Sequence, residues 1–232
     1  MIPTPVGMPP PVAQPRRRKP KERVLISDVP WGTYLRMNRA LEHKRNVRLA
    51  YDRGELEIMT PSFEHDRDAD TLGQLVRILT EELGLPIIPG GSVTLKRKAW
   101  KKGIEPDRCF WIANAARVSG IRRLDLKIHP PPDLGIEVDV TSSSLNRLAI
   151  YARLGVAEVW RLDGDDLVFH QLGAKRRYVA SPTSRAFPSV TPAELMDFVK
   201  QARTAADQNV VTRAFRAWVR SRASSPPAPP TP

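Results

Sequence analysis

The chain has 232 residues, 41% of them hydrophobic, which suffices for one domain of ordinary size and excludes two large ones. Lysine and arginine total 37 against 25 aspartates and glutamates, and the net charge of +12 favours a polyanion, first of all nucleic acid, as the large partner. The single cysteine, Cys109, excludes an internal disulfide framework and favours a reducing cytoplasm, and no apolar stretch approaches the roughly 20 residues that a membrane anchor needs.

Proline-rich ends flank the part of the chain that we expect to fold. Residues 1–22 combine many prolines with the basic run from Arg16 to Lys19, and this composition buries too little apolar surface to become ordered. We therefore predict a disordered basic arm over residues 1–22 and a single folded domain over residues 23–205. Residues 206–232 are predicted to form a C-terminal helical extension with a proline-rich tail.

The first elements expected in the domain are a helix and a hairpin. A helical stretch runs around Tyr34 to Leu41. Two short strand-like runs follow at residues 47–51 and 55–59, and the turn residues Asp52-Arg53-Gly54 lie between them. This pattern predicts a β-hairpin.

A long helix is expected next. Ser62 is a good N-cap for it, and Gly84 is a good residue to end it. In its first turn Glu64 and His65 stand side by side. His65 falls on the same helix face as Leu72, so the imidazole is predicted to point toward the core.

The second half of the chain alternates strand-like and helical runs. Thr141 to Ser144 supply N-cap candidates for a helix that ends at Gly155. Pro192 opens a last helix to about Ala206, which the segment 211–219 would extend. The strand-like runs are residues 87–88, 93–95, 107–112, 134–140, 156–162 and 167–172. This mixture predicts an α/β or α+β domain with a central mixed sheet flanked by helices.

Two acidic residues fall in runs whose neighbours suit a buried strand. Asp107 leads into the apolar residues 109–112, and Glu137 stands between Ile136 and Val138. An ionised carboxylate is costly to bury unless it is paired or holds a metal. One interpretation is a shared hard cation such as Mg²⁺, or Mn²⁺, which takes oxygen ligands and leaves positions free for a phosphate. The other is structural, with one acid at a strand end and the other paired with an arginine.

Further residues could complete such a site. Glu64 could add a third oxygen ligand, and His65 could be a general base or a satisfied first-turn histidine. Arg147 could supply a cation or be a solvated helix residue. Asp139 lies on the same strand face as Glu137, where an additional ligand and a salt bridge to Arg147 both remain open. The lysine-rich segment 96–102 would contact phosphates or form a solvated loop.

Several short strings, in this order and spacing, resemble a known family. They are Gly54-Glu55-Leu56-Glu57-Ile58-Met59-Thr60-Pro61-Ser62, then His65, Pro106-Asp107, Ile136-Glu137-Val138 and Tyr151-Ala152-Arg153-Leu154-Gly155-Val156-Ala157-Glu158-Val159-Trp160. Over about residues 25–205 the chain resembles the Uma-two family of putative restriction endonucleases, which belongs to the PD-(D/E)XK nuclease superfamily. The resemblance implies a restriction-endonuclease-like core, a carboxylate-bound Mg²⁺ and a DNA substrate. It places Asp107 and Glu137 in the two acidic strand positions and Glu64 or His65 in the helix position.

The sequence departs from this family at its lysine positions. The superfamily signature has a lysine two residues after the second acid, where this chain has Asp139. Many members of the family instead carry a lysine four residues before the tyrosine, and counting back from Tyr151 gives Arg147. Arginine is always charged, so it can stabilise a phosphate but cannot act as a base.

We therefore expect a Mg²⁺-dependent DNA endonuclease that hydrolyses phosphodiester bonds. In this hypothesis Asp107 and Glu137 bind the ion, Arg147 clamps the scissile phosphate, and Asp139 and His65 are further catalytic candidates. The alternative is a catalytically weak or inactive nuclease-fold protein that binds nucleic acid without cutting, and a third interpretation is a protein-interaction module. A homodimer would suit the cutting of two strands, although no residue specifies one.

Overall fold

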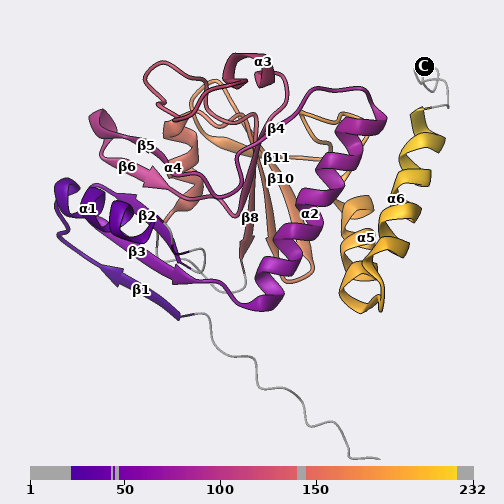
Figure 1. Cartoon of the computed structure of the whole chain (residues 1–232), viewed down its shortest axis with the longest axis horizontal. Coiled ribbons are helices and arrows are strands. Elements are labelled where there is room, and N and C mark those ends of the chain that lie inside the picture. The colour runs from indigo at the N-terminus through magenta and orange to yellow at the C-terminus, as the bar shows by residue number, and fades with distance from the viewer. Residues whose placement is uncertain (1–21, 43, 45–46, 140–144, 224–232) are drawn as a thin grey trace, which may run out of the picture.

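The structure is a computed structural model that describes residues 22–42, 44, 47–139 and 145–223. These residues form two β-sheets with helices packed on and between them (Figure 1). The α/β class predicted from the sequence is confirmed, and one sheet is mixed, as expected. The strands that were expected to share one sheet are divided between the two.

The first sheet is antiparallel and has the strand order β1-β3-β2-β6-β5. Its strands are β1 (Glu22–Ile26), β2 (Arg48–Asp52), β3 (Glu55–Thr60), β5 (Leu95–Arg97) and β6 (Lys102–Ile104). The predicted hairpin is confirmed as β2 and β3, with Gly54 at a positive φ of 112° in the turn. Strand β1, which begins at the last residue of the predicted arm, and strand β6 were not predicted.

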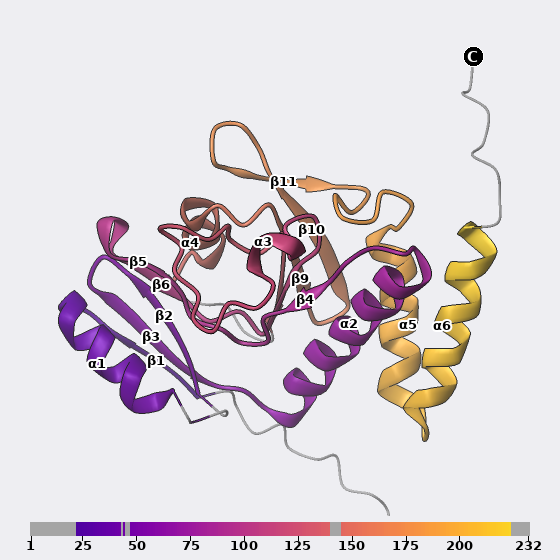
Figure 2. The same ribbon diagram turned by 45° about the horizontal axis from the view of Figure 1, so that its top comes forward.

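Helix α1 (Trp31–Leu41) covers this first sheet on its outer face (Figure 2). The ring of Tyr34 stacks on that of Tyr51 with centroids 4.8 Å apart. The Tyr34 hydroxyl lies so close to Gly103 in β6 that a Cβ at this position would collide with it. A glycine is therefore required where the helix meets the sheet.

The second sheet has the order β11-β10-β9-β8-β7-β4 and is mixed. Its strands are β4 (Ile88–Pro89), β7 (Arg108–Trp111), β8 (Leu134–Asp139), β9 (Glu158–Asp163), β10 (Asp166–Leu172) and β11 (Tyr178–Ser181). Strands β8 and β9 pair in parallel and the remaining neighbours are antiparallel. Parallel neighbours need a crossover connection, and α4 (Arg147–Leu154) provides it.

Helix α4 lies between the two sheets. Its residues Ile150 and Tyr151 share a buried cluster with Ala50 and Ile104 of the first sheet and Val159 of the second. The helix is capped by Asn146, whose side chain accepts the Ala149 N–H at 3.0 Å. The predicted caps at 141–144 lie outside the described residues. The first turn of α4 is thus held where the two sheets meet.

Helices α2 (Phe63–Glu82) and α5 (Pro192–Thr204) cover one face of the mixed sheet, and α6 (Gln208–Ala223) packs against these two helices (Figure 2). The predicted start of α2 is confirmed, because the Ser62 side chain accepts the His65 backbone N–H at 3.3 Å. The sequence suggested that residues 211–219 would extend α5, but the structure does not show this. They belong to the separate helix α6, which turns back and places Phe215 in the main core. The short helices η1 (Lys98–Trp100) and α3 (Ala115–Val118) lie in connections.

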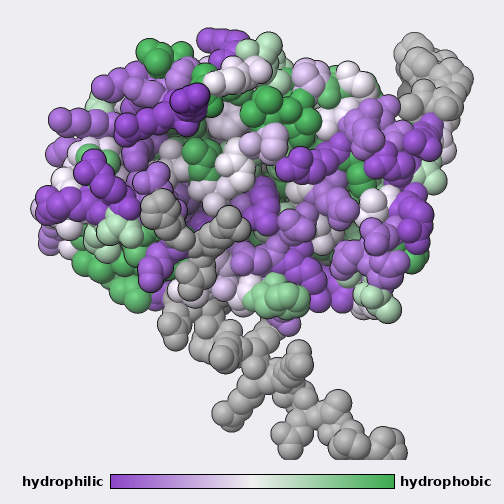
Figure 3. Space-filling model, viewed as in Figure 1, coloured by the Kyte–Doolittle hydropathy of each residue, from purple (hydrophilic) through white to green (hydrophobic). Residues whose placement is uncertain are grey.

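The visible surface is largely hydrophilic (Figure 3). Hydrophobic side chains gather at the lower left of that view, over α1 and β1, and the exposed residues of β1 include Val24, Leu25 and Ile26. Cys109 is buried and forms no disulfide. In the part of the chain that the structure describes, no helix is both long and apolar enough to cross a bilayer.

Candidate active site

Asp107 is buried directly before β7, with only 1% of its surface exposed. Its backbone N–H donates to the Ile136 carbonyl at 3.2 Å, which ties it to β8. The side-chain oxygen Oδ2 accepts the Val138 N–H at 2.9 Å and lies 3.0 Å from His65 Nε2. The other oxygen, Oδ1, accepts no hydrogen bond from any described residue. One oxygen of Asp107 is therefore held in place and the other remains for a ligand.

His65 is completely buried in the first turn of α2, as its helix register predicted. Its ring lies between two carboxylates, with Nε2 near Asp107 and Nδ1 3.4 Å from Asp66 Oδ1. Burial raises the pKa of Asp107. The contact and charge of His65, the charge of Arg147 and the Val138 N–H lower it by more, so the pKa of Asp107 lies below its ordinary value. Asp107 is therefore ionised at neutral pH, and His65 fixes its orientation.

Glu137 is held by a two-point ion pair and a hydroxyl group. Arg147 donates from Nε to Oε2 at 2.7 Å and from Nη2 to Oε1 at 3.1 Å. The Tyr151 hydroxyl, one turn along the same helix, also donates to Oε1. Burial raises the pKa of Glu137, and the nearby charge of Asp107 adds to the rise while Arg147 opposes it. Asp107 accepts the N–H of Val138, the neighbour of Glu137, and its charge contributes to the raised pKa of Glu137, so the structure brings the two carboxylates into one centre.

Arg147 joins the two sheets. Besides Glu137 of β8, its guanidinium donates to Glu57 Oε1 of β3 at 3.2 Å and to the Glu105 carbonyl at 3.3 Å. Its side chain is 8% exposed, which excludes the interpretation of a solvated helix residue. Burial lowers the pKa of Arg147, but Glu137 and the other negative neighbours raise it well above the ordinary value. The centre therefore contains a permanent positive charge.

Two residues of the centre were not predicted as functional. Glu57 is buried on β3, with Oε2 3.5 Å from Arg23 Nη1 of β1. Its signal in the sequence was an acid between Leu56 and Ile58, the same pattern that singled out Glu137. Tyr151 entered the sequence analysis only as part of a family motif. It is fully buried, but its hydroxyl also binds Glu137.

Other predicted site residues are not placed in this centre. Glu64 is exposed, although the neighbouring His65 is buried, so the structure does not place it as a third carboxylate beside Asp107. The backbone of Asp139 ends β8, but its side chain lies outside the described residues. In the basic segment, Lys102 is buried with Nζ 2.5 Å from Asp52 Oδ2, whereas Lys98 and Lys101 are exposed. Residues 96–102 belong to a β-hairpin with a short helical turn, formed by β5, η1 and β6, and not to a solvated loop.

The fit of a divalent cation depends on carboxylate oxygens that remain available. The buried Asp107 Oδ1 is such an oxygen. Glu137 is less available, because both its oxygens accept hydrogen bonds from Arg147. No cluster of three or more His, Cys, Asp or Glu side chains suited to a metal occurs among the described residues. Mg²⁺ commonly takes only one or two protein carboxylates together with waters, so these oxygens fit a sparsely ligated ion.

Comparison with known proteins adds a family match and a similarity to a solved structure. The family model described as Uma2, putative restriction endonuclease, matches residues 31–202. Among solved structures, the chain is similar to a putative nuclease belonging to DUF820 from Anabaena variabilis ATCC 29413. The two share 14% sequence identity over 65% of this chain and 90% of that chain, with a TM-score of 0.45. A comparison with curated proteins finds no match.

Proposed function

Because the chain belongs to the Uma2 family of putative restriction endonucleases, we propose that it is a DNA endonuclease that hydrolyses phosphodiester bonds at the centre formed by Asp107 and Glu137. The observation that supports this site is the buried Asp107 Oδ1, an ionised oxygen with no donor among the described residues. Burying such an oxygen costs free energy unless a ligand satisfies it. A buried carboxylate whose pKa is shifted by its charged neighbours is typical of functional sites.

Mg²⁺ is the proposed cofactor, with Mn²⁺ as a substitute. Held by Asp107 and Glu137, it would supply Lewis-acid activation of water and offset charge on the phosphate. His65 is a positioning residue that holds Asp107 Oδ2. Arg147 offers a fixed positive charge for a phosphate oxygen, but it cannot accept a proton from water.

A second candidate function is nucleic-acid binding without cleavage. It is favoured by the ion pair between Glu137 and Arg147, which occupies the carboxylate that the first candidate assigns to the metal. In this candidate the guanidinium neutralises Glu137 and Glu57 permanently. The fold would then retain its affinity for DNA and lose its chemistry.

The direct test of cleavage uses labelled DNA incubated with the full chain in Mg²⁺, Mn²⁺ or EDTA. Glu137→Gln, purified in the same way, is the control, because it keeps the shape of the side chain and removes its charge. We expect metal-dependent cleavage by the wild type and a loss of about 100-fold or more in the variant. Equal cleavage by both proteins would indicate a contaminant and overturn the proposal. Binding without cleavage by the wild type would support the second candidate.

Arg147→Lys separates the two candidates further. Lysine keeps the positive charge but cannot form the two-point contact with Glu137. If the centre is competent and restrained by the arginine, the variant should cleave faster than the wild type. If neither protein cuts while both bind DNA, the second candidate, nucleic-acid binding without cleavage, is supported.

Location and assembly remain proposals. A cytoplasmic location is supported by the single cysteine, Cys109, whose thiol is buried and unpaired with another cysteine. A homodimer would bring two centres to the two strands of a duplex. Light scattering of the purified chain, alone and with DNA, measures this directly, and a monomer in both states would contradict it.

A further inference from the structure

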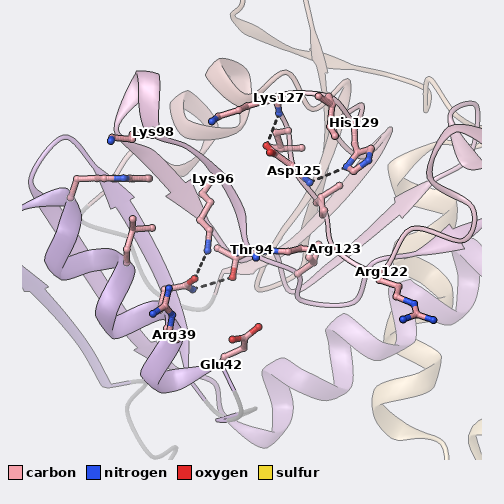
Figure 4. A pocket seen from close by; sticks show the side chains of 17 residues that line it. Arg39, Glu42, Thr94, Lys96, Lys98, Arg122, Arg123, Asp125, Lys127 and His129 are labelled. Carbon is pink, nitrogen blue, oxygen red and sulfur yellow. Dashed lines mark hydrogen bonds between the residues drawn. The ribbon is translucent and has the colours of Figure 1, made fainter.

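A basic groove lies between α1 and the segment 122–129, with β5 and the residues before it at its base (Figure 4). Its volume is about 1060 Å³. Six lysine or arginine side chains line it against two carboxylates. The basic residues are Arg39, Lys96, Lys98, Arg122, Arg123 and Lys127, and the acidic residues are Glu42 and Asp125.

Most of these positive charges are available to a ligand. Five of the six side chains are exposed, and they make no ion pair with any residue in the described ranges; they are Arg39, Lys98, Arg122, Arg123 and Lys127. Elsewhere basic residues are engaged, as where Arg216 contacts both Glu81 and Glu82. The sixth, Lys96, donates to Asn38 Oδ1 at 2.7 Å, and burial lowers its pKa. The groove is therefore a concentration of uncompensated positive charge.

The wall of the groove is joined to the buried centre through Glu105. Asn38 and Thr94, which line the groove, each donate to Glu105 Oε1 at 2.9 Å. The carbonyl of Glu105 accepts from Arg147 at 3.3 Å, and Asp107 follows two residues later. The side chain of Glu105 therefore contacts residues that line the groove, and its backbone carbonyl contacts Arg147 of the buried centre. A ligand in the groove would lie next to the segment that carries Asp107.

We propose that this groove binds the sugar–phosphate backbone of DNA and leads it toward Asp107. The basic residues lie on both sides of a concave surface, on α1, on β5 and η1, and on the segment 122–129, which suits a linear polyanion better than a small anion. Contacts of this kind position the nucleic acid without reading its sequence. Ile128, which is 73% exposed, and Trp31 add apolar surface for sugars or bases. The inference rests on the proposed function, because it locates the substrate of that site.

The test compares two triple variants that remove the same charge. The groove variant is Arg122→Gln, Arg123→Gln and Lys127→Gln. The control variant is Lys175→Gln, Arg177→Gln and Arg185→Gln, three exposed residues that do not line the groove. Binding of a labelled duplex to each full chain is measured by fluorescence anisotropy in EDTA, across a series of salt concentrations. Circular dichroism establishes that all the proteins are folded.

We expect the groove variant to bind about tenfold or more weakly and to lower the slope of log K against log salt by roughly 2 to 3. The control variant should bind within about twofold of the wild type. Equal weakening by both variants, or a wild-type salt slope in the groove variant, would overturn the inference. Anisotropy in EDTA is independent of cleavage. If the protein does not cleave DNA, the proposed function fails, but the groove variant can still show weaker binding. If the protein cleaves DNA and the groove variant binds like the wild type, only the inference about the groove fails.

Discussion

At the scale of single residues, Arg147 explains how acids from two sheets coexist in the interior. Its Nε and Nη2 face Glu137, and its Nη1 faces Glu57. A lysine has one compact ammonium group and could not span the same three contacts. Truncating one partner of such a buried pair leaves an uncompensated charge, which typically costs about 3–5 kcal/mol. The arginine therefore has a structural task in addition to its proposed role at the phosphate.

The hydrogen bond from the Tyr151 hydroxyl to Glu137 should make a measurable contribution to the free energy of unfolding. Tyr151→Phe removes a buried donor to an acid, so we expect a loss of about 1–3 kcal/mol in the free energy of unfolding. Tyr34→Phe is the matched control. The Tyr34 hydroxyl is buried without a hydrogen-bond partner among the described residues, so its removal should be neutral or stabilising. Urea unfolding measures both, and a larger loss in Tyr34→Phe than in Tyr151→Phe would contradict this reasoning.

The candidate site could be predicted in part because buried strand acids are unusual. Asp107 and Glu137 stood out among apolar neighbours, and His65 followed from helix register. Glu57 carried the same signal, but its partners Arg23 and Arg147 lie far from it in the chain. Which acid would be neutralised by which arginine depends on how the two sheets pack, and no local pattern contains that information.

At the scale of elements, the start of α5 contains a pH-sensitive cap. Glu194 accepts from the Thr191 backbone and side chain and pairs with Arg222. Burial raises the pKa of Glu194, but the Thr191 contacts and Arg222 together lower it below the ordinary value. A carboxylate with a lowered pKa in the folded state contributes stability above its unfolded pKa, and this contribution is lost as the pH falls toward the folded pKa.

Glu194→Gln should therefore be less stable than the wild type at neutral pH, and the difference should vanish in acid. Glutamine can still accept the Thr191 N–H, so only the charge is lost. The effect should stay below about 1 kcal/mol because the pair with Arg222 is accessible to solvent. Thermal unfolding of both proteins from neutral pH to below about pH 4 tests this. A difference that grows on acidification would show that the sign is wrong.

Elements defined by local signals were predicted well. The hairpin of β2 and β3 has its turn residues in sequence, and α2 has its cap at Ser62. Strand β1 was missed because its partner β3 is distant in the chain and a basic run precedes it. Strand β6 was missed because Lys102 suggested an exposed position, whereas Asp52 across the sheet neutralises it. Long-range partners decided both cases.

At the scale of the whole molecule, α6 belongs to the main core although the domain was predicted to end at residue 205. Phe215 is fully buried among the residues of α2, α5 and the mixed sheet. Phe215→Ala should therefore cost about 3–5 kcal/mol in the free energy of unfolding. Val210→Ala, at an exposed position on the same helix, should change it by less than about 0.5 kcal/mol. Chemical denaturation measures the free energy of unfolding of both variants. Similar losses in the two variants would mean that α6 is only loosely packed on the core.

The arrangement of the two sheets positions both the basic groove and the buried acidic centre. The first sheet carries Glu57 and supports the basic groove, the second carries Glu137, and α4 fixes Arg147 between them. A net charge of +12 favours a polyanionic partner without selecting a place on the molecule. The groove and the buried centre would select that place. The centre could be predicted only in part and the groove not as a unit, because each combines residues from segments that meet only in the folded chain.

The most direct measurement is the single-turnover cleavage rate of duplex DNA in Mg²⁺ by the wild type and by Asp107→Asn. Asparagine keeps an oxygen that can accept the Val138 N–H and removes the negative charge. We predict that the variant retains the DNA affinity of the wild type and loses about 100-fold or more in rate. Cleavage by Asp107→Asn at the wild-type rate would contradict the assignment of this buried centre as the active site.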